Sequence, residues 1–176
     1  MRFVDFLKAT VLLSAAAATA LATVTALTAA GGSHTALALG AAGWWSVATL
    51  VGLRLGRREQ ASEPIARLLA SAKASSVLPE QNPGVTLLNR LWPLLLFAVL
   101  AGALAVVGPQ IPGIGAGFAI IWALAWRRQH AAVQAIEERD GVRFYVLRTS
   151  PIRPIVLQRA PGFKALRPER VGRVAG

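Results

Sequence analysis

Few side chains in this sequence could catalyse a reaction or bind a metal ion. The chain of 176 residues contains two histidines and no cysteine, which excludes thiolate metal sites, iron–sulfur clusters and cysteine nucleophiles. His34 and His130 are separated by apolar segments that place them on opposite sides of a membrane, so they cannot share a metal ion. We therefore predict no metal site and no cofactor.

The polar residues with most catalytic potential follow the last apolar segment: His130, Glu137, Glu138 and Asp140. A serine–histidine–carboxylate triad needs a nucleophile on the same side of the membrane, and no GxSxG motif is present. Gly113, Gly115 and Gly117 are spaced like a phosphate-binding loop, but no lysine follows them. We predict that the protein is not an enzyme. A membrane enzyme that acts on lipid is an alternative hypothesis. It would require His130 or Glu137 to lie close to Asp140 in one cavity.

Long apolar segments must position these polar residues. Hydrophobic residues make up 55% of the chain and charged residues 15%, against about 25% in soluble proteins. Because about 20 apolar residues cross a bilayer, we predict an all-α membrane protein with four transmembrane helices, at about 9–30, 35–53, 91–107 and 111–126. Short turns rich in glycine join the helices into two tight hairpins, with a cytoplasmic loop at 54–90. The last two segments are short, and we favour full spanning over a re-entrant hairpin.

The basic residues predict the orientation of the transmembrane region, 1–126. Of the 19 lysines and arginines, two precede the first span, six lie in the 54–90 loop and eleven lie in the 127–176 tail. The two hairpin turns contain none, so the positive-inside rule places both termini in the cytoplasm. The abundance of arginine, alanine and glycine indicates a GC-rich bacterial genome, and hence the bacterial inner membrane. The alternative for the first span is a cleaved signal peptide, although its apolar stretch exceeds the usual 7–15 residues.

Small residues predict where the helices pack, because association in lipid depends on close approach of the backbones. We expect intramolecular packing, more than a homodimer interface, at Ala18, Ala22, Ala26, Gly52, Gly113 and Gly117. Trp44 and Trp45 lie in the middle of a span, where each indole N–H needs an acceptor, and a packed helix interface would supply one.

The polar segments carry weaker structural signals. Ser62-Glu63-Pro64 predicts the start of a short amphipathic helix, which either lies on the inner leaflet or packs on the ends of the bundle. The tail should continue the fourth span as a helix to about Arg139. Alternation from Val142 to Leu147 and the apolar run Ile155 to Leu157 then predict a β-hairpin.

The basic tail is the main functional signal. It has eleven basic and four acidic residues, and no nucleic-acid-binding motif. No ionisable residue lies within a span, which argues against a proton-coupled transporter. Our functional hypothesis is an accessory or docking protein that binds anionic lipid or a protein partner, with no nucleic acid. The candidate contacts are Arg127, Arg128, Arg143, Arg148, Arg153 and Arg159. The alternative is a small channel or permease subunit that assembles as a homo-oligomer.

Overall fold

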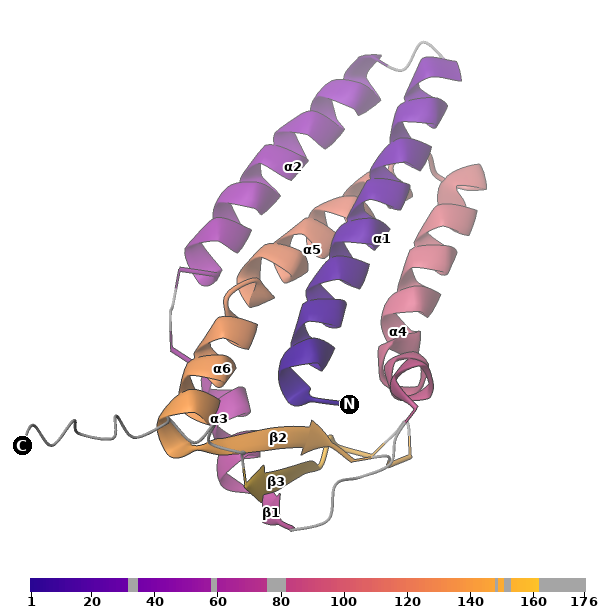
Figure 1. Cartoon of the computed structure of the whole chain (residues 1–176). Helices are drawn as coiled ribbons and strands as arrows, with labels where there is room; N and C mark the ends of the chain where they lie inside the picture. Colours follow the sequence, from indigo (N-terminus) through magenta and orange to yellow (C-terminus); the bar gives the residue numbers. More distant parts are fainter. Residues whose placement is uncertain (32–34, 58–59, 76–81, 148, 151–152, 162–176) are drawn as a thin grey trace, which may run out of the picture.

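The computed structural model describes residues 1–31, 35–57, 60–75, 82–147, 149–150 and 153–161. Four long helices account for most of it: α1 (Phe3–Gly31), α2 (Thr35–Leu55), α4 (Pro83–Ala103) and α5 (Ile111–Trp126). At one end of these helices lie α3 (Glu63–Ala70), α6 (Gln129–Asp140) and three short strands, β1 (Lys73–Ala74), β2 (Val142–Val146) and β3 (Leu157–Pro161) (Figure 1). We call α3, α6 and the three strands the basal layer.

Three helices are long and apolar enough to cross a membrane: α1, α2, and α4 with the short turn η1 (Leu104–Val106) that extends it. The prediction of membrane-spanning helices is confirmed to this extent. The fourth predicted span forms α5, a helix of 16 residues. At 1.5 Å per residue α5 is about 24 Å long, which is less than the ~30 Å of a hydrocarbon core.

Helix α5 is the central element of the bundle. It contacts α1 and α2 far more extensively than these two helices contact each other, and it also contacts α4. The short connection between α1 and α2 therefore joins two helices that diverge around α5 (Figure 1). The far ends of α1 and α2, and the α4–α5 connection, lie at the end of the bundle opposite to the basal layer.

Two of the helices begin earlier than the sequence predicts. Helix α1 starts at Phe3, because Phe3, Val4, Phe6 and Leu7 are buried against the basal layer although Asp5 and Lys8 interrupt the apolar pattern. Helix α4 starts at Pro83 and contains Pro93, which lacks the N–H that would bond the carbonyl of Asn89. Figure 1 shows the first turns of α4 at an angle to the rest of the helix, as expected for a proline kink.

The predicted β-hairpin is present and is part of a larger sheet. Strands β2 and β3 pair antiparallel, with Phe144 opposite Arg159. Strand β1, from the 54–90 loop, pairs parallel with β3 and gives the order β1-β3-β2. Helix α6 ends at Asp140, and Gly141 follows in the left-handed region at φ 62°, a conformation that glycine adopts without steric cost.

The start of the chain pairs with the free edge of the sheet. The N–H of Val146 donates to the carbonyl of Met1 at 3.0 Å, and Arg2 forms an antiparallel bridge with Tyr145. Cleavage of the first span as a signal peptide would remove this pairing and four members of the main apolar cluster, which also includes Ile65, Val133 and Phe144.

Helix α3 packs on the ends of the bundle, the second of the two predicted positions. Ile65 is buried in the apolar cluster, and Leu68 and Leu69 pack against it. Ser62 occupies the N-cap position, as predicted, but its side chain does not cap the helix. Its backbone N–H instead donates to Oε1 of Gln129 at 2.8 Å, which joins α3 to the start of α6.

Candidate functional site

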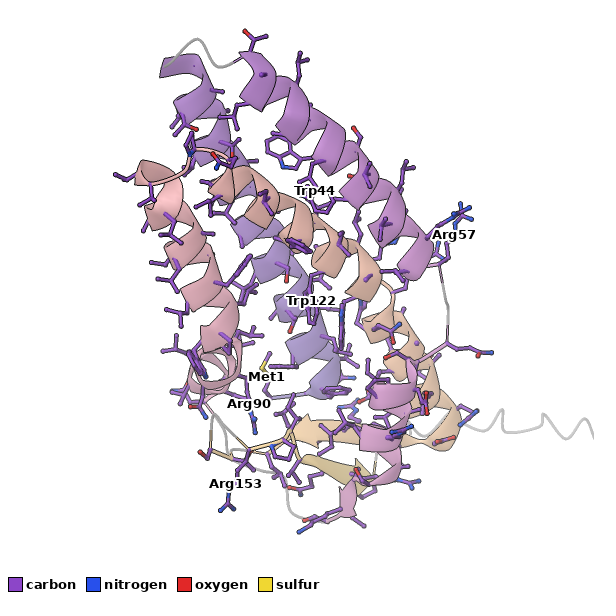
Figure 2. All side chains as sticks on the ribbon, turned by 180° about the vertical axis from the view of Figure 1, so that it is seen from behind. Met1, Trp44, Arg57, Arg90, Trp122 and Arg153 are labelled. Carbon is purple, nitrogen blue, oxygen red and sulfur yellow. The ribbon has the colours of Figure 1, made fainter. Side chains whose placement is uncertain are left out.

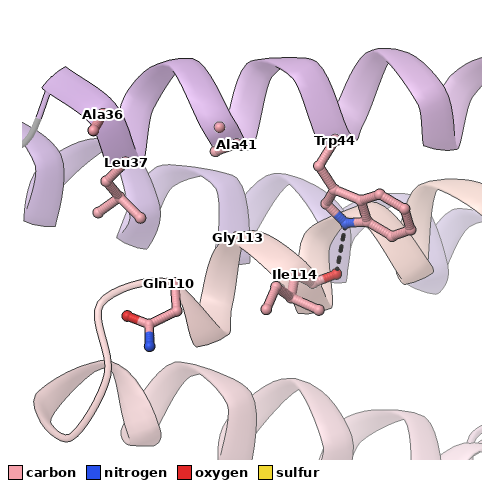
Figure 3. A pocket seen from close by; sticks show the side chains of 8 residues that line it. Ala36, Leu37, Ala41, Trp44, Gln110, Gly113 and Ile114 are labelled. Carbon is pink, nitrogen blue, oxygen red and sulfur yellow. Dashed lines mark hydrogen bonds between the residues drawn. The ribbon is translucent and has the colours of Figure 1, made fainter.

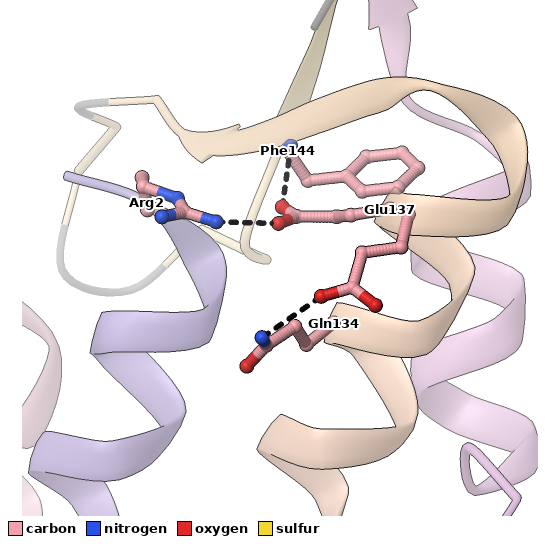
Figure 4. A network of polar contacts seen from close by, with 5 residues as sticks. Arg2, Gln134, Glu137 and Phe144 are labelled. Atoms are coloured by element: carbon pink, nitrogen blue, oxygen red, sulfur yellow. Dashed lines mark hydrogen bonds and ion pairs between the residues drawn. The ribbon is translucent and has the colours of Figure 1, made fainter. Parts of the chain in front are cut away.

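The acidic residues of α6 have structural partners. Glu137 is buried: its Oε2 accepts from Nη2 of Arg2 at 2.8 Å, and its Oε1 accepts from the N–H of Phe144 at 2.9 Å (Figure 4). Phe144 is in the edge strand β2, and its N–H has no neighbouring strand to bond in the described part of the chain. The Glu137 carboxylate accepts from this N–H, which would otherwise be buried without an acceptor. The hydrogen bond to Glu137 raises the pKa of Arg2, and burial opposes it. This network fixes the chain start, α6 and β2 to one another.

The other polar residues with catalytic potential do not form a cluster with Glu137. Asp140 accepts from Nε of Arg139 at 2.8 Å, and this pairing lowers the pKa of the Asp140 carboxyl. Glu138 accepts from Gln134 on the exposed side of α6. His130 lies two turns before Glu137 on the same helix, about 10 Å along the axis. Among the described residues, no three histidine or acidic side chains are grouped closely enough to hold a metal ion.

The two tryptophans of α2 donate to the backbone of α5. Nε1 of Trp44 bonds the carbonyl of Ile114 at 3.1 Å, and Nε1 of Trp45 bonds that of Gly113 at 2.8 Å. A Cβ added at Gly117 would overlap the Trp44 indole, so glycine is needed there for the ring to reach its acceptor. Figure 3 shows Trp44 over α5, at one end of a cavity of about 300 Å³ lined by Leu37, Ala41 and Gln110. The indoles thus hold α2 against α5.

Most of the predicted packing residues lie at helix contacts. Gly52 approaches Leu124 and Ile121, and Gly113 approaches Thr25 and Ala41. On α1, Ala18 is buried, Ala22 is half-buried and Ala26 is exposed. Because four residues advance a helix by about 40° more than one turn, a strict four-residue stripe drifts off the contact face. The buried line of α1 instead passes through Ser14, Ala18, Leu21 and Thr25.

The predicted contact arginines are divided between two places. Arg127 and Arg128 lie at the junction of α5 and α6, where Nη1 of Arg128 donates to the carbonyl of Arg57. Arg143, Arg153 and Arg159 are exposed on the sheet or its connections. Arg148 lies outside the described residues. The five described arginines therefore do not form one cluster.

Arg90, at the basal end of α4, makes contacts that the sequence alone does not predict. Its guanidinium donates to Oγ1 of Thr149 and to the carbonyls of Arg153 and Pro154. Its neighbour Asn89 donates from Nδ2 to the carbonyl of Thr149 at 3.0 Å. Figure 2 shows Arg90 between Met1 and Arg153, at the base of the bundle. The first turns of α4 thus hold the β2–β3 connection.

The fold and these contacts define an α-helical protein with three helices able to cross a membrane and a small mixed sheet at one end. The sequence matches no known protein family, no curated protein and no solved structure. The basal layer and the helix ends that support it are therefore the basis for any functional conclusion.

We predict that Glu137→Ala destabilises the basal layer by about 1–3 kcal/mol, the usual cost of leaving buried donors without an acceptor. Thermal unfolding in detergent measures this loss, and hydrogen exchange should show faster exchange at the Phe144 amide. Glu138→Ala is the matched control, because Glu138 is exposed and its removal should cost less than about 0.5 kcal/mol. Equal melting temperatures for the two variants would contradict the assigned role of Glu137.

We predict that Gly117→Ala destabilises the bundle by about 1–3 kcal/mol, because the new methyl group displaces the Trp44 indole. Gly43→Ala, where a Cβ meets nothing within 4 Å, should be neutral or stabilising by up to about 1 kcal/mol. Thermal unfolding checks both variants. Combining Gly117→Ala with Trp44→Ala should cost less than the sum of the single changes, and strict additivity would contradict the contact.

Proposed function

We propose that this chain is a four-span protein of a bacterial plasma membrane, with both termini in the cytoplasm, that acts without catalysis as a docking protein. The topology is supported by the distribution of charge. Every lysine and arginine lies in the chain start, the 54–90 loop or the tail, and all the described ones lie at or beyond the basal end of the bundle. The positive-inside rule therefore places the basal layer in the cytoplasm.

The position of α5 supports a fourth crossing. Helix α5 begins at the α4–α5 connection, on the end away from the basal layer, and leads directly into α6 of the basal layer. Helix α5 itself is about 24 Å long, so the proposed fourth crossing uses α5 together with the residues that flank it. Trp122 and Trp126 near its basal end fit the interfacial position that tryptophan prefers, and Arg127 can extend its head group to the interface.

The observation that supports docking is a set of exposed arginines on a layer that is held firmly to the bundle. Arg143, Arg153 and Arg159 project from the sheet and its connections, and none forms an ion pair with a described residue. The Glu137 network, the Arg90 contacts and the apolar cluster hold that layer in place. A rigid surface loses less entropy on binding, so these cations suit an acidic face of a protein partner.

The arginines at the helix ends have a different proposed contact. Arg54 lies in the last turn of α2 and Arg57 just after it, and Arg127 and Arg128 follow α5. In this topology the four reach the level of the inner-leaflet head groups. Each basic residue near an anionic leaflet contributes about 1 kcal/mol. We therefore assign these residues to general attraction to anionic lipid, and the sheet arginines to the partner.

The docking proposal predicts that a photo-reactive residue placed at Tyr145 or Pro154 cross-links in cells to one discrete acidic protein. Each exposed ion pair contributes about 0.2–1 kcal/mol. The triple variant Arg143→Gln, Arg153→Gln, Arg159→Gln should therefore reduce binding of the purified partner roughly tenfold.

The control double variant Arg54→Gln, Arg57→Gln removes cations from the helix ends and should leave that affinity unchanged while it weakens binding to anionic liposomes. Cross-links that spread over many proteins, or an affinity that the triple variant does not change, would contradict docking at the sheet.

A second candidate, a small channel or permease subunit, is favoured by one observation. Gly40 and Gly43 lie on α2 with open space where a side chain would be, so another helix could approach closely there. This candidate predicts a defined homo-oligomer by native mass spectrometry and solute flux in liposomes. Gly43→Leu should dissociate the oligomer, and a monomeric wild-type protein without flux would count against it.

A further inference from the structure

A second cavity lies at the basal end of the bundle, where α1, α3, α4 and α5 meet. Its volume is about 220 Å³, and its walls are mostly apolar. They include Phe3, Phe6 and Leu7 of α1, Leu68 of α3 and Leu91 of α4. An apolar cavity offers water few hydrogen bonds, so it favours an apolar occupant. We call this space the basal cavity.

The basal cavity has one cationic residue in its wall, Arg90. The groups that Arg90 bonds, the hydroxyl of Thr149 and the carbonyls of Arg153 and Pro154, are all neutral. No carboxylate in the described part of the chain pairs with it, whereas Arg2, another partly buried arginine of the basal end, has Glu137. Partly buried charges are normally paired, and the described part of the chain supplies no anion to Arg90.

The tryptophans of α5 connect the basal cavity to the outer surface of the bundle. Trp122 and Trp126 both line it, and their rings stack with centroids 5.6 Å apart. Trp122 is 50% exposed and also lines the cavity, so the wall of the cavity reaches the surface of the bundle at this residue. Figure 2 shows Trp122 beside α5, above Arg90 in this view. In a membrane this opening is at the depth of the inner interface, where tryptophan is enriched.

We propose that the basal cavity binds one anionic phospholipid of the inner leaflet, with part of an acyl chain inside the cavity and the phosphate paired with Arg90. The combination of an apolar space, a lateral opening and an unpaired cation matches the chemistry of such a lipid. Nε and the second hydrogen of Nη1 of Arg90 are not used in the bonds described, so the guanidinium can bind a phosphate without releasing the β2–β3 connection. The inference rests on the four-span topology proposed above and does not depend on the protein partner.

The geometry also links the lipid to the basal layer. Arg90 is the residue that holds the β2–β3 connection, and Arg153 of that connection is one of the proposed partner contacts. A phosphate bound at Arg90 would therefore lie close to the segment that carries this contact.

The test is native mass spectrometry of the delipidated full-length protein, titrated with phosphatidylglycerol or phosphatidylcholine of identical chains. The first phosphatidylglycerol should bind about tenfold more tightly than phosphatidylcholine, the difference expected for one charge-assisted pair. Arg90→Gln should abolish this preference. Leu68→Trp, which puts a larger side chain in the wall of the cavity, should weaken the first binding event for both lipids.

Two control variants separate a binding role of Arg90 from a structural one. Thr149→Ala removes a contact of Arg90 with the β2–β3 connection but keeps the charge, so the preference for phosphatidylglycerol should remain. Arg57→Gln removes an exposed arginine from the end of α2 and should also leave it unchanged. A preference that persists in Arg90→Gln, or that Thr149→Ala abolishes, would overturn the proposal.

A free phosphate is the other source of the same chemistry. Glycerol phosphate at millimolar concentration should not displace the bound lipid, and displacement would overturn the lipid proposal in favour of a soluble anion. Equal affinity of the wild-type protein for both lipids would also overturn it. These results are independent of the cross-linking experiment, so failure of the lipid site and failure of partner docking can be distinguished.

Discussion

The carboxylate of Glu137 joins three parts of the chain that are far apart in sequence. One oxygen accepts from Arg2 and the other from the N–H of Phe144, so the chain start, α6 and the edge of the sheet share one buried group. The pairing of Met1 with Val146 and the burial of Phe3 and Leu7 depend on this arrangement. In the described part of the chain the sheet has three strands, of which β1 has two residues, so it is little more than a two-stranded hairpin, which is marginal in water without a surface to pack on. The first turns of α1 supply that surface, and Glu137 holds them to the sheet.

A second constraint acts within the bundle. Helix α5 contacts α1, α2 and α4, so it can carry few large side chains on its inner faces. Three glycines of α5 lie against side chains of its neighbours. Gly113 and Gly115 face Thr25 and Leu21 of α1, and Gly117 faces Trp44 of α2. The lack of side chains leaves backbone carbonyls accessible to the indoles of α2. The same glycines therefore permit close packing and the only polar contacts described between α2 and α5.

Much of this architecture is visible in the sequence, and the exceptions have physical reasons. The apolar runs predict the four long helices, and alternation after Asp140 predicts β2, because these elements repeat a pattern over many residues. Strand β1 has two residues, Lys73 and Ala74, and no pattern of that length distinguishes a strand. The sequence does not show the start of α1, because Asp5 and Lys8 lie on its exposed side and interrupt the run of apolar residues. The roles of Arg90 and Glu137 depend on contacts between residues more than 50 positions apart, which a single sequence does not reveal.

The pairing of Met1 with Val146 has a consequence for biogenesis. Met1 forms its native contact with Val146 of β2, across almost the whole length of the described chain. The basal layer therefore cannot close until all the intervening helices have been synthesised and β2 has emerged. During that interval the aromatic residues of the first turns of α1 lack their native cover and are exposed to chaperones and proteases. The sheet is thus completed late, and only when every preceding helix has folded correctly. In a chain with a misplaced helix, the apolar first turns of α1 would stay exposed.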